Sequence, residues 1–420
     1  MSIKSIFACS LLVIILPMSQ QSFAQVMKWD LNDVSYLFHL PGGDAQADID
    51  LLGPEDHGVS GALLPRELYQ QVPTLLIGGN GNPTLYKKAL RVIAARIDPC
   101  PSLDANRCVP EIRLIWQPVE HDGYAGEWVA GDAAIHSFYK LSHNNFESLK
   151  NELWRIKQWL ASQGVTTTST ALDIHPALKN RNTADTFNHQ IQQTLIKYAG
   201  SSNLEKFTYV ALMAPTRWWR FGIFEKNADG TWNTTEIPRL DMTTEDIFNT
   251  AVEDGVGLGL EKGIDAVFNI FPEEYPDTDN IFMVINKGYR FNDERDKAVF
   301  KEKLDAIARF RNPHNTNPDN LDCASCHYAD ATKHYIGNRF PELDKVSTAA
   351  EFINPAPDIF NLENLSLAAK SGRNVRAFGY FKDKPVIIQR TINESAVSAN
   401  RLNTHTLAGQ KTIEERPRRL

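Results

Sequence analysis

Apolar residues recur at helical spacing in three long segments of the chain. Such spacing places them on one face of a helix with 3.6 residues per turn, which a folded protein buries. The pattern predicts helices over residues 146–160, 183–198 and 292–309. The apolar positions of the first helix are Phe146, Leu149, Leu153, Ile156 and Leu160. Gly164 follows this helix and is expected to end it.

Two shorter segments also have a pattern that favours a helix. In residues 85–97 the apolar residues Leu90, Ile93 and Ile97 are separated from Lys87, Lys88, Arg91 and Arg96. We therefore expect an amphipathic helix with its basic face in water. Residues 133–141 can form a helix as well, with His136 as a packed or hydrogen-bonded side chain.

Runs of β-branched and aromatic residues predict strands elsewhere. The clearest are residues 111–119 and the buried run 207–213. Two pairs of short strands flank turn sequences and predict hairpins. They are 221–224 with 231–237, around Asn227-Ala228-Asp229-Gly230, and 377–381 with 385–389, around Lys382-Asp383-Lys384.

Strands and helices together predict an α+β (mixed α/β) fold. We expect a large N-terminal domain of mixed sheet and helices over residues 25–290. A smaller C-terminal region over residues 291–420 would carry the cysteine motif described below.

The first 24 residues have the organisation of a secretory signal. Lys4 provides the positive start, an apolar run follows from Ile6 to Met18, and Ser22-Phe23-Ala24 places small residues before a cleavage site. The apolar run is shorter than the roughly 20 residues that a membrane span requires. We expect cleavage before Gln25, export to the periplasm, and no membrane span in the mature chain.

The net charge of the chain argues against one class of partner, nucleic acid. The chain has a formal net charge of −7, and without residues 1–24 it holds 43 basic and 51 acidic residues. A mildly acidic protein has no basic excess with which to attract nucleic acid, so a nucleic-acid partner is not expected.

Export changes the interpretation of the cysteines, because an oxidising compartment favours disulfides. Cys100 and Cys108 lie eight positions apart and are predicted to form a local disulfide. That pairing leaves Cys323 and Cys326 as a second set. A zinc site would need further ligands at matching spacing, and the sequence has no second C-x-x-C.

The second set belongs to the sequence Cys323-Ala324-Ser325-Cys326-His327. Two thiols separated by two residues can form thioether bonds to the two vinyl groups of haem, and the adjacent histidine can bind the iron. These residues resemble the attachment motif of c-type cytochromes. The resemblance covers five residues and implies one covalent haem c, with Cys323 and Cys326 as attachment points and His327 as proximal iron ligand.

The ligand on the opposite side of the iron is not identified by the sequence. Many small c-type cytochromes use a methionine downstream of the motif, and this chain has none after Met283. The candidates are His314, His334, His405, Met213, Met242 and Met283. An iron bound on both sides transfers electrons, whereas an open position binds small molecules such as peroxide.

The sequence thus predicts an exported, c-type cytochrome-like haem protein with an electron-transfer or other redox role. A redox partner protein or a small-molecule substrate would accompany it. Two alternatives stay open: a secreted binding or structural protein with disulfides Cys100–Cys108 and Cys323–Cys326 and no haem, and a monohaem peroxidase-like enzyme. The large domain contains none of the common hydrolase or metalloprotease motifs that would add a catalytic function.

Overall fold

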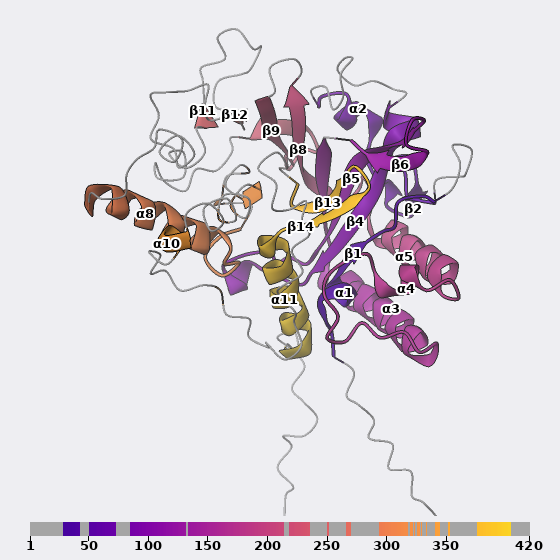
Figure 1. The fold of residues 1–420 in the computed structure, drawn as a ribbon. Coiled ribbons are helices and arrows are strands. Elements are labelled where there is room, and N and C mark those ends of the chain that lie inside the picture. The colour runs from indigo at the N-terminus through magenta and orange to yellow at the C-terminus, as the bar shows by residue number, and fades with distance from the viewer. Residues whose placement is uncertain are drawn as a thin grey trace, which may run out of the picture.

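The centre of the molecule is a twisted antiparallel sheet. The structure is a computed structural model, and it describes residues 28–42, 50–72, 85–131, 133–213, 218–235, 250–251, 266–269, 294–317, 341–344 and 376–404, with single positions at 320, 321, 323, 326, 327, 329, 333 and 352. Over these residues ten strands join in the order β1-β4-β5-β7-β8-β9-β12-β11, with β6 paired to β5 and β10 to β9. Figure 1 shows this sheet between two groups of helices.

The strands of this sheet are β1 (Ser35–Leu37), β4 (Leu90–Asp98), β5 (Glu111–Asp122), β6 (Glu127–Ala130), β7 (Ala134–Lys140), β8 (Leu204–Met213), β9 (Trp218–Lys226), β10 (Trp232–Thr235), β11 (Thr250–Ala251) and β12 (Ala266–Asn269). Two small hairpins stand apart from it: β2 (His57–Gly58) with β3 (Gly61–Ala62), and β13 (Phe378–Phe381) with β14 (Lys384–Ile387). The helices are α1 (Leu31–Val34), α2 (Arg66–Tyr69), α3 (His143–Ser162), α4 (Pro176–Lys179), α5 (Ala184–Tyr198), α8 (Glu294–Phe310), α10 (Pro341–Asp344) and α11 (Gln389–Thr404). The fold class is α+β, as the sequence predicted.

The long helices lie where their apolar spacing predicted them. The side chain of Ser142 caps α3 by accepting a hydrogen bond from the backbone N–H of Asn145. Gly164 follows α3 with a φ of +75°, a conformation that suits glycine. In Figure 1, α3, α4 and α5 lie on one side of the sheet, while α11 and the β13–β14 hairpin lie on the other.

Two predictions of helix were wrong. Residues 85–97 form a short π-helix, Leu85–Ala89, followed by strand β4, and residues 134–140 form strand β7. Both strands are central in the sheet and buried on both faces, so they lack the alternation of a half-exposed strand. In β4 a bulge between Val92 and Ala94 also shifts the register and interrupts the two-residue alternation of side chains.

The β13–β14 hairpin lies across the sheet and is bound to it by Gln117 of β5. The Gln117 amide donates to the Tyr380 carbonyl at 3.0 Å, and its oxygen accepts from the Tyr380 N–H at 2.7 Å. The approach is so close that a Cβ on Gly379 would lie 2.4 Å from the Gln117 side-chain oxygen. Glycine at position 379 therefore lets the hairpin reach the sheet.

Residues far apart in the sequence share one hydrophobic core. Phe378, Ile387 and Ile392 belong to the same buried cluster as the sheet and helices α3 and α5. The predicted domain boundary at residue 290 lies outside the described residues. Residues 1–27, which include the predicted signal sequence, lie outside them as well.

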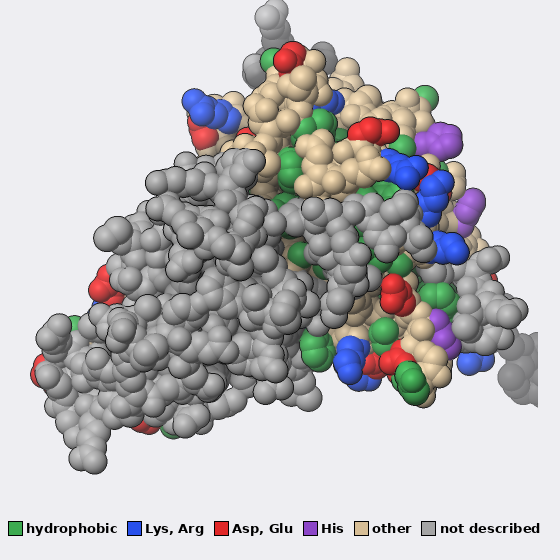
Figure 2. Space-filling view, turned by 90° about the horizontal axis from the view of Figure 1, so that it is seen from above, with side chains coloured by type: hydrophobic (Ala, Val, Ile, Leu, Met, Phe, Trp, Pro, Cys, Tyr) green, Lys and Arg blue, Asp and Glu red, His purple; other side chains and the backbone are tan. Residues whose placement is uncertain are grey.

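The surface carries both signs of charge. Figure 2 shows basic and acidic side chains interspersed on the described part of one face. None of the helices formed by described residues combines the length and apolar character needed to cross a lipid bilayer.

Candidate functional site

A cavity lies between the sheet and the C-terminal segments. Its enclosed volume is about 80 Å³, and it is partly open to solvent. The sheet contributes one of its faces, because side chains alternate along a strand and every second residue points the same way. The sheet residues that line the cavity are Arg96 of β4, Arg113 and Ile115 of β5, His136 and Phe138 of β7, Thr208 of β8 and Ile223 of β9.

The residues of the cysteine motif line the opposite wall. Cys323, Cys326 and His327 have helical backbone conformation and are all partly buried. Positions i, i+3 and i+4 of a helix share one face, so this spacing turns both sulfurs and the imidazole toward the same cavity. Leu321, Ala377 and Phe378 add apolar surface beside them.

His136 lies opposite His327. The ring centroids of the two imidazoles are 5.8 Å apart, and the ring planes differ by 25°. Phe221 of β9 packs edge-on against His327, with 5.6 Å between ring centroids. Burial, followed by the neighbouring His327, Arg113 and Arg96, holds the pKa of His136 well below its usual value. His136 is therefore neutral at pH 7.

Three arginines and one carboxylate supply the charge of the cavity wall. Glu394 of α11 forms ion pairs with Arg96 and with Arg390, the latter at 2.8 Å, and lies 3.7 Å from Arg113. Burial lowers the pKa of Arg96 to about 9 and that of Arg390 to about 10, so both stay protonated at neutral pH. The lining thus has an excess of positive charge.

The three arginines differ in how completely the protein binds them. Arg390 donates to the Phe310 carbonyl at 2.8 Å and to both oxygens of Thr316 at 2.6 Å, which ties α11 to the segment after α8. Arg113 donates to Glu111 at 3.2 Å and stacks over the Phe138 ring at 4.6 Å, while its buried Nε has no hydrogen-bond partner among the described residues. Burying a donor without a partner is costly, so an acceptor that enters the cavity can satisfy Arg113.

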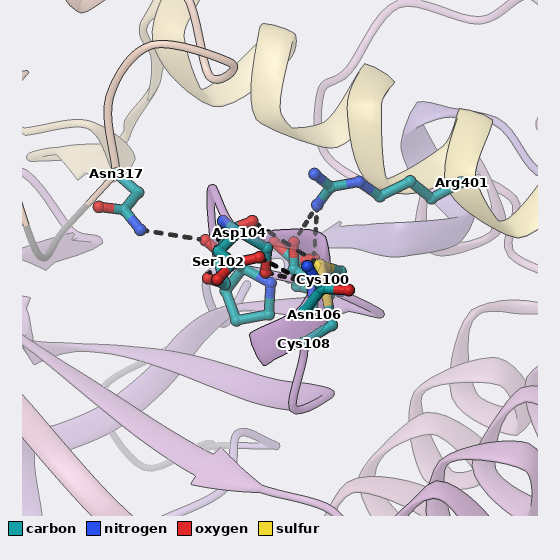
Figure 3. Close-up of a disulfide and its surroundings, with 9 residues drawn as sticks. Cys100, Ser102, Asp104, Asn106, Cys108, Asn317 and Arg401 are labelled. Atoms are coloured by element: carbon teal, nitrogen blue, oxygen red, sulfur yellow. Dashed lines mark hydrogen bonds and ion pairs between the residues drawn. A yellow bond between two sulfur atoms is a disulfide. The ribbon is translucent and has the colours of Figure 1, made fainter. Parts of the chain in front are cut away.

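The predicted disulfide Cys100–Cys108 is present, and its loop supports the cavity wall (Figure 3). Asn317, a lining residue, donates to the Pro101 carbonyl at 3.4 Å, and Arg401 of α11 donates to the Cys100 carbonyl. The loop therefore holds together α11 and the segment that leads into the cysteine motif.

The structure brings together the predicted residues Cys323, Cys326 and His327, and adds three that the sequence interpretation missed. Arg96 was assigned to the solvated face of a helix and His136 to a packed position in one, while Arg113 lies in the predicted strand 111–119 and was given no role. Of the candidate iron ligands, His314 is exposed, stands 5.7 Å from Phe352 by ring centroids and is not among the lining residues. His334, His405, Met242 and Met283 lie outside the described residues, and for Met213 only the backbone is described.

Within the described part of the chain, no group of three or more His, Cys, Asp or Glu side chains is placed to hold a bare metal ion. Comparison with protein-family models, with curated proteins and with solved structures finds no match to this chain.

Proposed function

We propose that this protein is an exported, c-type cytochrome-like haem protein with an electron-transfer role. The observation that carries the proposal is that Cys323, Cys326 and His327 face one cavity, directly opposite a second imidazole. Thiols and imidazole are the groups that c-type haem attachment uses.

The lining of the cavity fits the chemistry of haem. The macrocycle is apolar, and Ile115, Phe138, Ile223, Leu321 and Phe378 offer apolar contacts. Haem also carries two carboxylates, and Arg113 offers a guanidinium with an unused donor.

The roles of the residues follow from their chemistry. When bound, haem supplies a one-electron couple between ferric and ferrous iron. Cys323 and Cys326 would each add S–H across one vinyl C=C bond, with the sulfur bonding to one carbon and the hydrogen to the other. His327 would hold the iron through a ring nitrogen.

The test is to express the full chain with its signal sequence in a host that matures c-type cytochromes. We expect the purified periplasmic protein to keep a haem-stained band under denaturing conditions, with a mass increase equal to one haem. Replacing both motif cysteines (Cys323→Ala with Cys326→Ala) should abolish the covalent pigment.

The matched control replaces the other cysteine pair (Cys100→Ser with Cys108→Ser), which should leave the haem band in whatever protein is recovered. A colourless wild-type protein whose mass corresponds to two disulfides would reject the proposal in favour of a binding or structural protein.

A further inference from the structure

We infer that His136 of β7 is the second axial ligand of the iron, so that the haem is held between the sheet and the cysteine motif. This inference rests on the proposed function and extends it. It assigns a metal ligand about 190 positions upstream of the motif, on a strand of the central sheet.

The first argument is distance. Two imidazoles that bind one metal through ring nitrogens, each at about 2 Å, have their ring centroids roughly 6 Å apart. The observed separation between His136 and His327 is 5.8 Å, with ring planes 25° apart. Ring pairs that pack directly in this protein span 4.1 Å for His175 and Phe187 to 5.6 Å for Tyr36 and His175, so the distance permits ligation and the placement of His136 carries the inference.

The second argument is placement. His136 pairs with Ile115 of β5 on one side and with Thr208 of β8 on the other, in the middle of three long strands. A ligand on such a strand is held rigidly, which suits a metal site better than a loop does. Ile115 and Thr208 line the same cavity, so they flank the imidazole on its own face of the sheet.

The third argument is the absence of a competitor on the described wall. Among the lining residues that the structure describes, His136 and His327 are the two imidazoles, and none is a methionine. The carboxylate of Glu394 is already engaged by Arg96 and Arg390.

Ligation by His136 selects among the roles that the sequence left open. An iron bound by two imidazoles has no vacant position for peroxide or another small molecule, so the protein would transfer electrons rather than catalyse peroxide chemistry. The sheet then takes part in the redox site directly, because one iron ligand belongs to it.

The test compares His136→Ala with His189→Ala, an exposed histidine on α5. All proteins are purified as haem-loaded full chains, and their absorption and electron paramagnetic resonance spectra are recorded. Wild type and His189→Ala should be low-spin, and their ferrous forms should not bind carbon monoxide. His136→Ala should retain the covalent haem, become high-spin and bind carbon monoxide. Added imidazole should restore its low-spin spectrum, which a merely structural role would not allow.

His136→Met is the second variant, in case the alanine variant does not fold. A thioether in place of imidazole should keep the iron low-spin and raise the reduction potential. A haem-loaded wild type that binds carbon monoxide readily, or a His136→Ala spectrum identical to wild type, would overturn the inference and leave the haem assignment intact. Absence of haem from wild type would instead reject the proposed function itself.

Discussion

Two buried clusters of charge, on different parts of the sheet, are built on opposite principles. In the first, Asp33 of α1 pairs with Lys157 of α3, and Thr167 donates to the other Asp33 oxygen at 2.7 Å. Lys157 also donates to the Lys28 carbonyl and to Thr167. The neighbouring buried carboxyl of Asp30 accepts from the backbone N–H groups of Leu31 and Ser169. In the cavity, three arginines surround Glu394, and the Arg113 Nε has no partner among the described residues.

The difference shows which cluster is structural and which is available for binding. In the Asp33–Lys157 cluster, hydrogen bonds from neighbouring residues satisfy both charged groups, so no ligand is needed there. The arginine cluster keeps an excess of positive charge beside an open volume, which favours an anionic group within it. The following predictions test this contrast, from the largest expected effect to the smallest.

Breaking the Asp33–Lys157 ion pair should cost the most stability. Lys157→Met leaves the buried Asp33 carboxylate without its cation, and burial already raises the pKa of Asp33. Removing one partner of a buried ion pair typically costs about 3–5 kcal/mol. We expect urea denaturation to show a loss of that size, with the haem content of the folded protein unchanged. The double variant Asp33→Asn with Lys157→Met should lose less, and an equal or greater loss would contradict this account.

The same side of the sheet holds a histidine that should make the fold acid-sensitive. His175 caps α4 by accepting from the Ala177 N–H at 3.1 Å, and burial lowers its pKa to about 3. Its usual pKa is about 6.5, so the stability that depends on neutral His175 is complete above pH 6.5. This stability is lost as the pH falls from 6.5 toward 3.

At pH 5 the loss due to His175 should be about 2 kcal/mol. His175→Asn keeps a side-chain acceptor for the Ala177 N–H and cannot take up the proton. The difference in unfolding free energy between variant and wild type should therefore shift in favour of the variant by about 2 kcal/mol between pH 7 and pH 5. A difference that is independent of pH would show that His175 is not buried as a neutral group.

Under the proposed function, a change of charge in the cavity should alter the reduction potential of the haem. Arg113→Gln removes one positive charge that favours the reduced iron, so the reduction potential should fall by on the order of 50 mV, equivalent to about 1 kcal/mol. Thermal unfolding should shift to lower temperature as well, because Arg113 pairs with the buried Glu111 at 3.2 Å. Lys179→Gln, at an exposed ion pair with Asp173, is the control and should leave the potential unchanged. If Arg113→Gln leaves the reduction potential unchanged, the haem carboxylates do not lie beside Arg113.

The sequence predicted the helices and turns that local patterns determine. It missed the residues of the sheet that face the cavity. Helices α3 and α5 and the β13–β14 hairpin follow from spacing, caps and turns within a few residues of each element. Strands β4 and β7 were taken for helices because both of their faces are buried. One face of each strand lines the cavity, with Arg96 on β4 and His136 on β7. Asn317 and later residues form the other wall of the cavity. No local pattern reveals that His136 faces a motif about 190 residues away.

The loop closed by Cys100 and Cys108 has a consequence for biogenesis. Under the proposed function the two cysteine pairs need opposite treatment in one compartment: the first must be oxidised, and the second must stay reduced until it meets haem. Their positions separate these demands, because the first pair is only eight residues apart and enters the compartment more than 200 residues before Cys323. An oxidase acting on the emerging chain can thus close the correct pair before a wrong partner is present. The finished loop then offers the carbonyls of Cys100 and Pro101 to the C-terminal segments that complete the cavity.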